Sequence, residues 1–465
     1  MKTHFYRAYL PSWVFFVPLL FLSCSHTKVE PIPPQDSQDI AAKIREEHDL
    51  GIELEVVNAE IKRVGAILKK KHWSRQEITF LERFMKKYIL LQNSISEASL
   101  KVPPFTAIRV ELGSFCLNPE SASPSSFELF DLQLENPGIR YFSKIIRFIG
   151  EVGEASENKV QELLWNLKWE TYYENYPDYL KKLLLEIDLS APIFLPSMKR
   201  ERVKDIIKQS VPGAQEVDDI TNLARGVYHD YESFRELIEQ KKSSFEENEN
   251  ENVLRPVPGR SGLYLKTQSN GFSKQILTFY NTTNTSQSID FSQSFLQPVR
   301  QDVQAIGVYI NLNARKAILD KVYSFLIRTL SKLYPTVTKK ERELIEKDPL
   351  TSFRVFLLAR DAERSAEKCV GGNCVNDSCD AFRHFVWAGL LTREFGEETA
   401  RHYLNAHEDG PGKREDREMD IFNNEKGIEG AKGLRNNFSQ EELESLGLEW
   451  VRKKILQLEP RKDFP

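Results

Sequence analysis

The sequence predicts a mainly α-helical, multidomain protein of the α+β class, with a small antiparallel β insert and a C-terminal helical domain. Apolar residues recur every three or four positions over most of the chain, and helix-capping residues precede several of these runs. The pattern changes to short β-type runs only near residues 253–313. A chain of 465 residues is too long for a single core, so several domains are expected.

The composition narrows the classes of function. Hydrophobic residues make up 40% of the chain and charged residues 28%, as in soluble globular proteins. The formal net charge of −4 leaves no large basic field, so nucleic acid is not expected as a partner.

The N-terminus has the layout of an export signal. Lys2 and Arg7 give it a basic start, and an apolar run over 13–22 ends at the small residue Ser23. The run is too short to span a bilayer, which takes about 20 apolar residues. The weaker interpretation is an ordinary secreted protein in which the next residue, Cys24, is incidental.

The residues Leu20-Phe21-Leu22-Ser23-Cys24 resemble the lipobox of bacterial lipoproteins, with Phe21 where that family usually has Leu. The resemblance implies that residues 1–23 are a signal peptide and that Cys24 is acylated, so that lipid attaches the protein to a membrane. Ser25, in place of the Asp that retains such proteins in the inner membrane, implies the outer membrane. The Pro-rich residues 24–38 are then expected to form a tether.

Residues 39–100 are predicted to form a helical hairpin. Ser74 and Glu77 have the spacing of a capping box at the start of its second helix. The seam of this hairpin would pack within the chain or form a short coiled coil with a partner. The seam consists of Leu50, Leu54, Val57, Ile61, Val64 and Leu68, then Leu81, Phe84, Tyr88, Leu91 and Ile95.

Residues 101–245 are predicted to be a helical, aromatic-rich domain that opens with a turn-rich stretch over 113–119. Its aromatic residues either belong to a core or line a groove for a protein or glycan partner. They are Trp165, Trp169, Tyr172, Tyr173, Tyr176 and Tyr179. Residues 253–313 follow as the small β region, with strands expected near 264–267, 276–280, 288–291 and 303–310.

Four further cysteines, Cys116, Cys369, Cys374 and Cys379, are disulfide candidates in an exported protein. The last three are spaced five residues apart in a loop rich in Gly, Asn and Asp. A cysteine zinc site is the weaker interpretation, because structural zinc sites usually show pairs two to four residues apart.

Residues 314–465 are predicted to form the C-terminal helical domain, and they carry the densest polar pattern. Three segments contribute to it: Asp380-Ala381-Phe382-Arg383-His384, Ala406-His407-Glu408, and Met419-Asp420-Ile421-Phe422-Asn423-Asn424 with Gly427. Asp380 is placed as the N-cap of a helix that Gly396 ends. Asp420, Asn423, Asn424 and Gly427 share one helix face, so three helices would direct these side chains to a common centre.

These motifs, over about 375–435, resemble those of an uncharacterised family of bacterial helical domains found in exported proteins, including lipoprotein-like and toxin-like chains. Phe385 departs from the family, which more often has a small residue there, and Cys379 precedes the Asp. The resemblance implies no activity.

From the residue types, His384, His407, Glu408 and Asp420 would bind a divalent metal such as zinc or share acid–base work in an envelope hydrolase. Arg383, Asn423 and Asn424 would hold its substrate. The alternative is a non-enzymatic scaffold or adhesion lipoprotein in which the same residues form a structural polar network.

Overall fold

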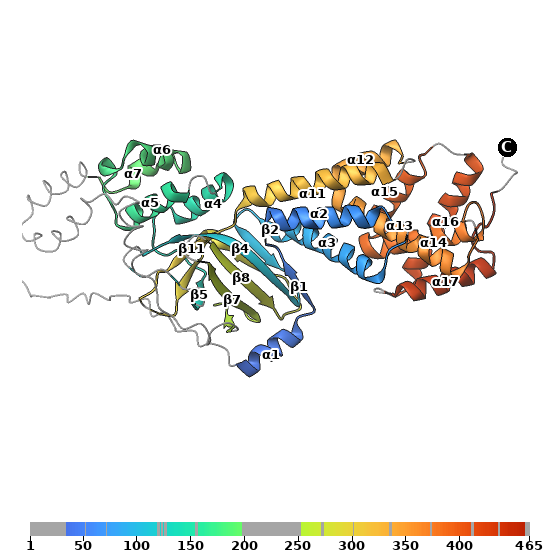
Figure 1. Ribbon diagram of the computed structural model, residues 1–465, viewed down its shortest axis with the longest axis horizontal. Coiled ribbons are helices and arrows are strands. Elements are labelled where there is room, and N and C mark those ends of the chain that lie inside the picture. The colour runs from blue at the N-terminus through green and yellow to red at the C-terminus, as the bar shows by residue number, and fades with distance from the viewer. Residues whose placement is uncertain are drawn as a thin grey trace, which may run out of the picture.

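The structure is a computed structural model that describes residues 34–197 and 253–460, apart from short gaps at 52, 71, 119–120, 122–123, 125–127, 154–156, 271–273, 301, 334–336, 373, 411–412 and 436–437. The predicted signal peptide, Cys24, most of the tether and residues 198–245 lie outside this range. The small helical unit lies over one end of a central β-sheet, and a longer helical bundle extends from the other end (Figure 1). Among the described residues, no helix combines the length and the apolar character that crossing a membrane requires.

The expected helical hairpin is present as α2 (Leu54–Leu68) and α3 (Arg75–Ser94). The predicted capping box of Ser74 and Glu77 at the start of α3 is confirmed. Most of the apolar seam is buried in the core, and both helices pack against α11 (Leu312–Leu333) of the same chain (Figure 1). Residues 34–38, expected in the tether, instead form the start of a helix, α1 (Pro34–Lys43).

The main sheet is built around β4 (Thr106–Cys116). The prediction of a turn-rich stretch over 113–119 is wrong for residues 113–116, which lie in this strand. Gly113, the first residue of that stretch, lies in the strand opposite Tyr309, where a Cβ atom would overlap the tyrosine ring. Glycine is therefore required for close packing at this position and not for chain reversal.

The strand order of the main sheet is β5-β10-β11-β4-β8-β7-β6, with β1 (Glu46–Asp49) added in parallel to β4 and the other pairs antiparallel. The remaining bounds are β5 (Phe130–Gln133), β6 (Arg255–Pro256), β7 (Leu263–Asn270), β8 (Lys274–Asn281), β10 (Phe295–Pro298) and β11 (Ile306–Tyr309). A second sheet joins β2 (Ile95–Ser96), β3 (Ser99–Val102) and β9 (Gln287–Asp290). The predicted mixture of helices and antiparallel strands is confirmed, but the sheet is larger than a small insert because distant segments contribute to it.

Side chains join the two end strands of this order. Arg255 on β6 donates through Nε and Nη2 to the two carboxylate oxygens of Asp131 on β5, and both residues are buried. The sheet therefore curls until its two ends approach each other.

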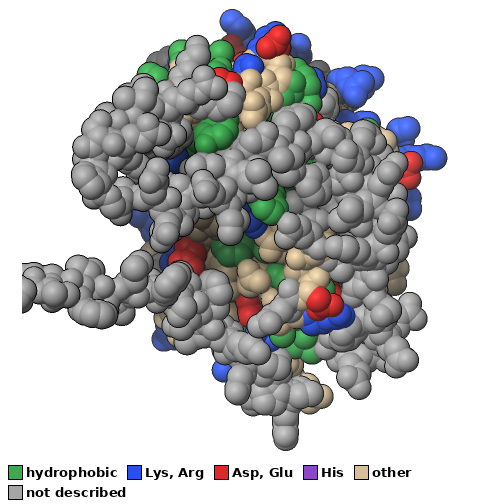
Figure 2. Space-filling model, turned by 90° about the vertical axis from the view of Figure 1, so that its left-hand side faces the viewer, with side chains coloured by type: hydrophobic (Ala, Val, Ile, Leu, Met, Phe, Trp, Pro, Cys, Tyr) green, Lys and Arg blue, Asp and Glu red, His purple; other side chains and the backbone are tan. Residues whose placement is uncertain are grey.

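The small helical unit contains α4 (Phe142–Val152), α5 (Glu157–Lys168), a 3-10 turn η2 (Tyr173–Asn175), α6 (Asp178–Ile187) and α7 (Ala191–Phe194). Trp165, Tyr172 and Tyr176 are buried, which places half of the aromatic cluster in a core and not in a groove. At this end of the molecule, the visible side chains of the described residues are a mixture of hydrophobic and charged groups (Figure 2).

The C-terminal bundle consists of α12 (Lys339–Lys347), α13 (Pro349–Cys369), α14 (Ser378–Phe395), α15 (Glu397–His407), α16 (Arg414–Gly433) and α17 (Gln440–Arg452). Helix α14 is its centre and contacts α13, α15, α16 and α17. Helices α14 and α16 approach closely because Gly427 has no side chain; a Cβ atom there would meet the Phe385 carbonyl oxygen. Gly396, with φ of 82°, ends α14 as predicted.

Candidate functional site

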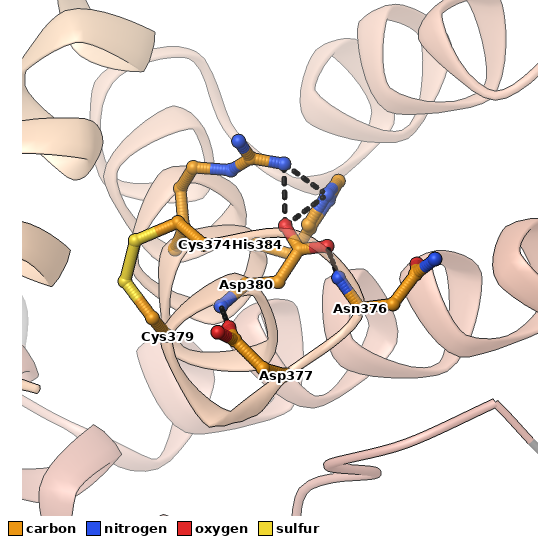
Figure 3. The surroundings of a disulfide bond; sticks show 7 residues. Cys374, Asn376, Asp377, Cys379, Asp380 and His384 are labelled. Carbon is orange, nitrogen blue, oxygen red and sulfur yellow. Dashed lines mark hydrogen bonds and ion pairs between the residues drawn. A yellow bond between two sulfur atoms is a disulfide. The ribbon is translucent and has the colours of Figure 1, made fainter. Parts of the chain in front are cut away.

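The candidate site surrounds His384, which lies one turn inside α14 and is only 3% exposed. The helix starts earlier than the sequence suggested. Asp377, and not Asp380, is the N-cap, since its side chain accepts a hydrogen bond from the backbone N–H of Asp380. The Asp380 side chain is thereby free to turn toward His384, with its Oδ1 atom 3.6 Å from the histidine Nε2 atom (Figure 3).

A disulfide between Cys374 and Cys379 closes the loop before this helix (Figure 3). Within the loop, the backbone N–H of Asn376 donates to Asp380 Oδ2 over 2.7 Å. The loop thus fixes the second carboxylate oxygen of Asp380 while the first faces His384. The other two disulfide candidates, Cys116 and Cys369, are thiols.

A chain of hydrogen bonds fixes the tautomer of His384. The Asn424 amide nitrogen donates to Glu408 Oε1 over 2.9 Å, so the amide oxygen of Asn424 faces His384 Nδ1 at 3.2 Å. That oxygen can only accept, and therefore Nδ1 carries the proton. The lone pair of Nε2 then points to the opposite side of the ring, where it accepts from Arg383 Nη2 over 3.1 Å.

Two carboxylates meet this lone pair. Asp420 Oδ1 lies 3.4 Å from Nε2, and Asp380 Oδ1 lies 3.6 Å from it. The Asp420 Oδ1 atom is buried and has no hydrogen-bond partner among the described residues. Three electron-rich atoms, each within 4.8 Å of the others, therefore converge on one point. Such an arrangement is unfavourable unless a cation lies between them or one carboxylate holds a proton.

The spacing of these atoms suits a small divalent cation. A tetrahedral ion with nitrogen and oxygen ligands at about 2.0–2.2 Å holds neighbouring ligand atoms about 3.3–3.6 Å apart. The two distances to Nε2 fall in this range. The Glu408–Asn424–His384 chain also matches the way proteins orient a metal-binding histidine through its other nitrogen.

The electrostatics of the cluster reflect this crowding. Burial, with the nearby charges of Glu408 and Asp380, raises the pKa of Asp420 to about 7. Burial likewise raises the pKa of Asp380 and of Glu408. Burial, with the charge of Arg383, lowers the pKa of His384 well below its usual value. The histidine is therefore neutral at pH 7 and can ligate a cation.

The structure does not bring every predicted residue to this point. His407 turns instead to Glu341, whose Oε1 atom lies 2.8 Å from His407 Nδ1. Burial lowers the pKa of His407, but the hydrogen bond and charge of Glu341 outweigh it and raise that pKa overall. Asn423 bonds the backbone of Gln457 through both ends of its amide, which fixes the C-terminal segment.

Sequence reasoning did not identify three residues at or near the site as functional. Asp380 was noticed but placed as an N-cap, a role that Asp377 fills. Glu341 forms a capping box with Thr338 at the start of α12, a local role that gave no signal of its contact with His407. Trp387 follows His384 by three positions, and that spacing was the available signal that both would face the same side of α14.

A cavity of about 180 Å³ lies on the other side of Arg383 and His384. Its polar lining includes Arg383, His384, Trp387 and His407. Its apolar walls come from α11, the segment before α12, α12 and α13: Leu330, Val337, Ile345, Val355, Phe356 and Ala359. The polar cluster therefore adjoins a space in which a small apolar group would fit.

Residues 342–454, which contain this whole cluster and most of the pocket, match the model of a family described as a domain of unknown function, DUF6973. This match agrees with the uncharacterised domain expected from the motifs. Comparisons with curated proteins and with solved structures found no match.

Proposed function

We propose that this chain is a lipid-anchored protein of the bacterial outer membrane whose C-terminal domain is a divalent-metal-dependent hydrolase. The observation that carries the catalytic part is the convergence of Asp380 Oδ1, His384 Nε2 and Asp420 Oδ1 at ligand–ligand distances. Their chemistry, one neutral imidazole and two carboxylates, suits zinc or a similar ion.

Each residue has a part in this proposal. Asp380, His384 and Asp420 would hold the ion, while Glu408 and Asn424 orient the histidine. A bound divalent ion lowers the pKa of a coordinated water and so supplies a nucleophile near pH 7. In the hydrolysis, water adds to an acyl carbon, the bond to the leaving oxygen or nitrogen breaks, and the leaving atom takes a proton.

Arg383 would compete with the ion for two of its ligands. Its Nη2 atom bonds both Asp380 Oδ1 and His384 Nε2. Since its side chain is 32% exposed, it can move out toward the pocket when an ion enters. In that position it would meet a negatively charged or carbonyl group of a substrate.

The proposal is tested by the metal content of the purified protein. We expect one zinc ion per chain after exposure to zinc. Asp420→Asn should weaken zinc binding more than about 100-fold, because losing a direct ligand weakens binding more than losing a residue that only hydrogen-bonds to a ligand. Asp361→Asn is the matched control, because that aspartate is also 18% exposed but pairs with Arg364 outside the cluster. Equal zinc binding by wild type and Asp420→Asn would overturn the metal site.

Hydrolysis is measured on the same preparations with p-nitrophenyl acetate. Zinc-loaded wild type is expected to cleave this ester, and Asp420→Asn is expected to show only background cleavage. If zinc binds but no ester, amide or phosphoester is cleaved, the hydrolase is refuted and the cluster is a structural metal site.

The anchor rests on the lipobox residues of the sequence. Replacing Cys24 with Ala should release the protein from the membrane fraction, and mass spectrometry of the wild-type N-terminus should find acylated Cys24. Unchanged sedimentation of Cys24→Ala would contradict the anchor and would leave the metal site unaffected.

The scaffold alternative is favoured by one observation, the nearly complete burial of His384. In that case the cluster would only fix the angles between α14, α15 and α16. Asp420→Asn would then change the free energy of unfolding without any effect of added metal on either protein.

A further inference from the structure

The pocket beside the cluster contains a buried hydrogen-bond donor without an acceptor. The Trp387 indole lines the pocket, the residue is only 8% exposed, and its Nε1–H has no partner among the described residues. Its ring packs edge-on against His407, with ring centroids 5.0 Å apart. Buried polar groups are almost always hydrogen-bonded, so this donor points to a ligand that brings an acceptor.

The charges at the same end favour an acceptor with negative or partly negative oxygen. Arg383 also lines the pocket, while its Nη2 atom bonds Asp380 and His384. Glu341 and Glu363 line it too, but Glu341 is bonded to His407 and Glu363 to Arg360. The hydroxyls of Ser352 and Tyr403, also in the lining, are 3.2 Å apart and satisfy each other. The groups left for a ligand oxygen are therefore the Trp387 N–H and the guanidinium nitrogens of Arg383 other than Nη2.

The rest of the pocket selects an apolar group of limited size. An engineered apolar cavity of about 150 Å³ takes up benzene, so about 180 Å³ has room for roughly six to eight carbon atoms. The His407 side chain, which lines the pocket, is 40% exposed, and this gives the ligand a route from solvent.

We infer that this pocket binds the acyl group of a carboxylic acid derivative of about six to eight carbons, the carbonyl carbon included. Its apolar part would lie against α13 and its carbonyl or carboxylate oxygen at Trp387 and Arg383. The ligand places its acyl carbon beside His384 and the carboxylate cluster. That the pocket binds such a ligand does not depend on the proposed hydrolase. Only the statement that this ligand is the acyl part of the hydrolase's substrate rests on the proposed function.

The test uses hexanoate as the probe and the purified full chain with EDTA present, so that it does not depend on metal. Hexanoate should bind at least about tenfold more tightly than acetate, since four more methylenes leave water. It should also shift the Trp387 signal among the 15N-labelled indoles, assigned with Trp387→Phe. An unshifted Trp387 signal at saturating hexanoate, or equal binding of acetate and hexanoate, would overturn the inference.

Three variants sharpen the result. Trp387→Phe should weaken hexanoate binding about tenfold through the lost hydrogen bond, and Ala359→Phe should block binding by filling the pocket. Trp73→Phe is the matched control, because the Trp73 indole N–H also lacks a partner among the described residues but does not line the pocket. An equal loss in Trp73→Phe would refute the specific role of Trp387. Hexanoate binding without zinc binding would refute the proposed metal hydrolase and leave this pocket assignment standing.

Discussion

Two arginine–aspartate pairs in this protein differ in their hydrogen bonding and in their burial. Arg255 and Asp131 form a two-pronged pair, with both residues buried, between the end strands of the curled sheet. Arg383 meets Asp380 through a single nitrogen, shares that nitrogen with His384, and keeps a side chain that is 32% exposed.

The difference separates a structural pair from a displaceable one. The Arg255 guanidinium matches its carboxylate with two parallel hydrogen bonds and leaves no space for another cation. The Arg383 guanidinium covers part of a cluster in which Asp420 Oδ1 still has no hydrogen-bond partner among the described residues. A polar group in the core that is incompletely paired indicates a place for a ligand, whereas a complete pair indicates stability.

The largest effect is expected at the structural pair. Arg255→Met leaves Asp131 as an unpaired buried charge and should lower the free energy of unfolding by about 3–5 kcal/mol in denaturant titrations. Adding Asp131→Leu should restore most of it, because a hydrophobic pair of similar volume can replace a buried ion pair. If Arg383→Met destabilised the protein as much, the distinction between the two pairs would fail.

The next effect is pH dependence at Asp420. Its pKa of about 7 in the fold lies above the value of 3.8 expected when unfolded. The fold therefore keeps a proton that the unfolded chain releases, and this contribution to stability, up to about 4 kcal/mol, is lost as pH rises from about 4 to about 7.

The measurement compares Asp420→Asn with wild type. Without metal, the free energy of unfolding of Asp420→Asn minus that of wild type should rise over this range. Saturating zinc should remove the pH-dependent loss in wild type, since the ion replaces the proton; a difference that stays flat with pH would contradict this account.

A smaller effect is expected at the disulfide. Replacing Cys374 and Cys379 with Ser should lower the free energy of unfolding by about 2 kcal/mol, the loop-closure contribution of so short a loop. It should also weaken zinc binding about tenfold, because the Asn376 N–H no longer holds Asp380 in place. Cys369→Ser is the control. Unchanged zinc affinity in the double variant would show that the loop supports the fold alone.

The smallest effect has the opposite sign. Arg383→Gln should increase zinc affinity about tenfold, or about 1.4 kcal/mol, because it removes the competing cation while keeping a polar side chain. Calorimetric titration with zinc would measure the change. Weaker zinc binding in Arg383→Gln would mean that Arg383 supports the cluster instead of occupying its cation site.

Local signals in the sequence predicted the helices well, and long-range pairing accounts for what they missed. The capping boxes and the apolar spacing of α2 and α3 act over a few residues and are visible in the chain itself. Strand β4 was missed although Ile108, Val110 and Leu112 alternate with polar residues just before Gly113. Its neighbours β8 and β11 lie more than 150 residues further along, so the pairing that extends the strand through Gly113 cannot be read locally.

The candidate site was predicted in its centre and not in its details. Helical spacing placed His384, Glu408, Asp420 and Asn424 together, as the structure does. Asn423 precedes Asn424 by one residue, and about 100° of helix rotation turns it to Gln457 instead. The direction of His407 could not be predicted, because Glu341 belongs to a helix that begins about 70 residues earlier.

The central claim is that Asp380, His384 and Asp420 form a cation site that Arg383 fills in the metal-free protein. A crystal structure of the zinc-soaked protein, with anomalous data at the zinc edge, tests it most directly. We predict an anomalous peak about 2.0–2.2 Å from the three ligand atoms, with the Arg383 guanidinium moved toward the pocket. No peak at saturating zinc, with Arg383 still bonded to Asp380 and His384, would contradict the claim.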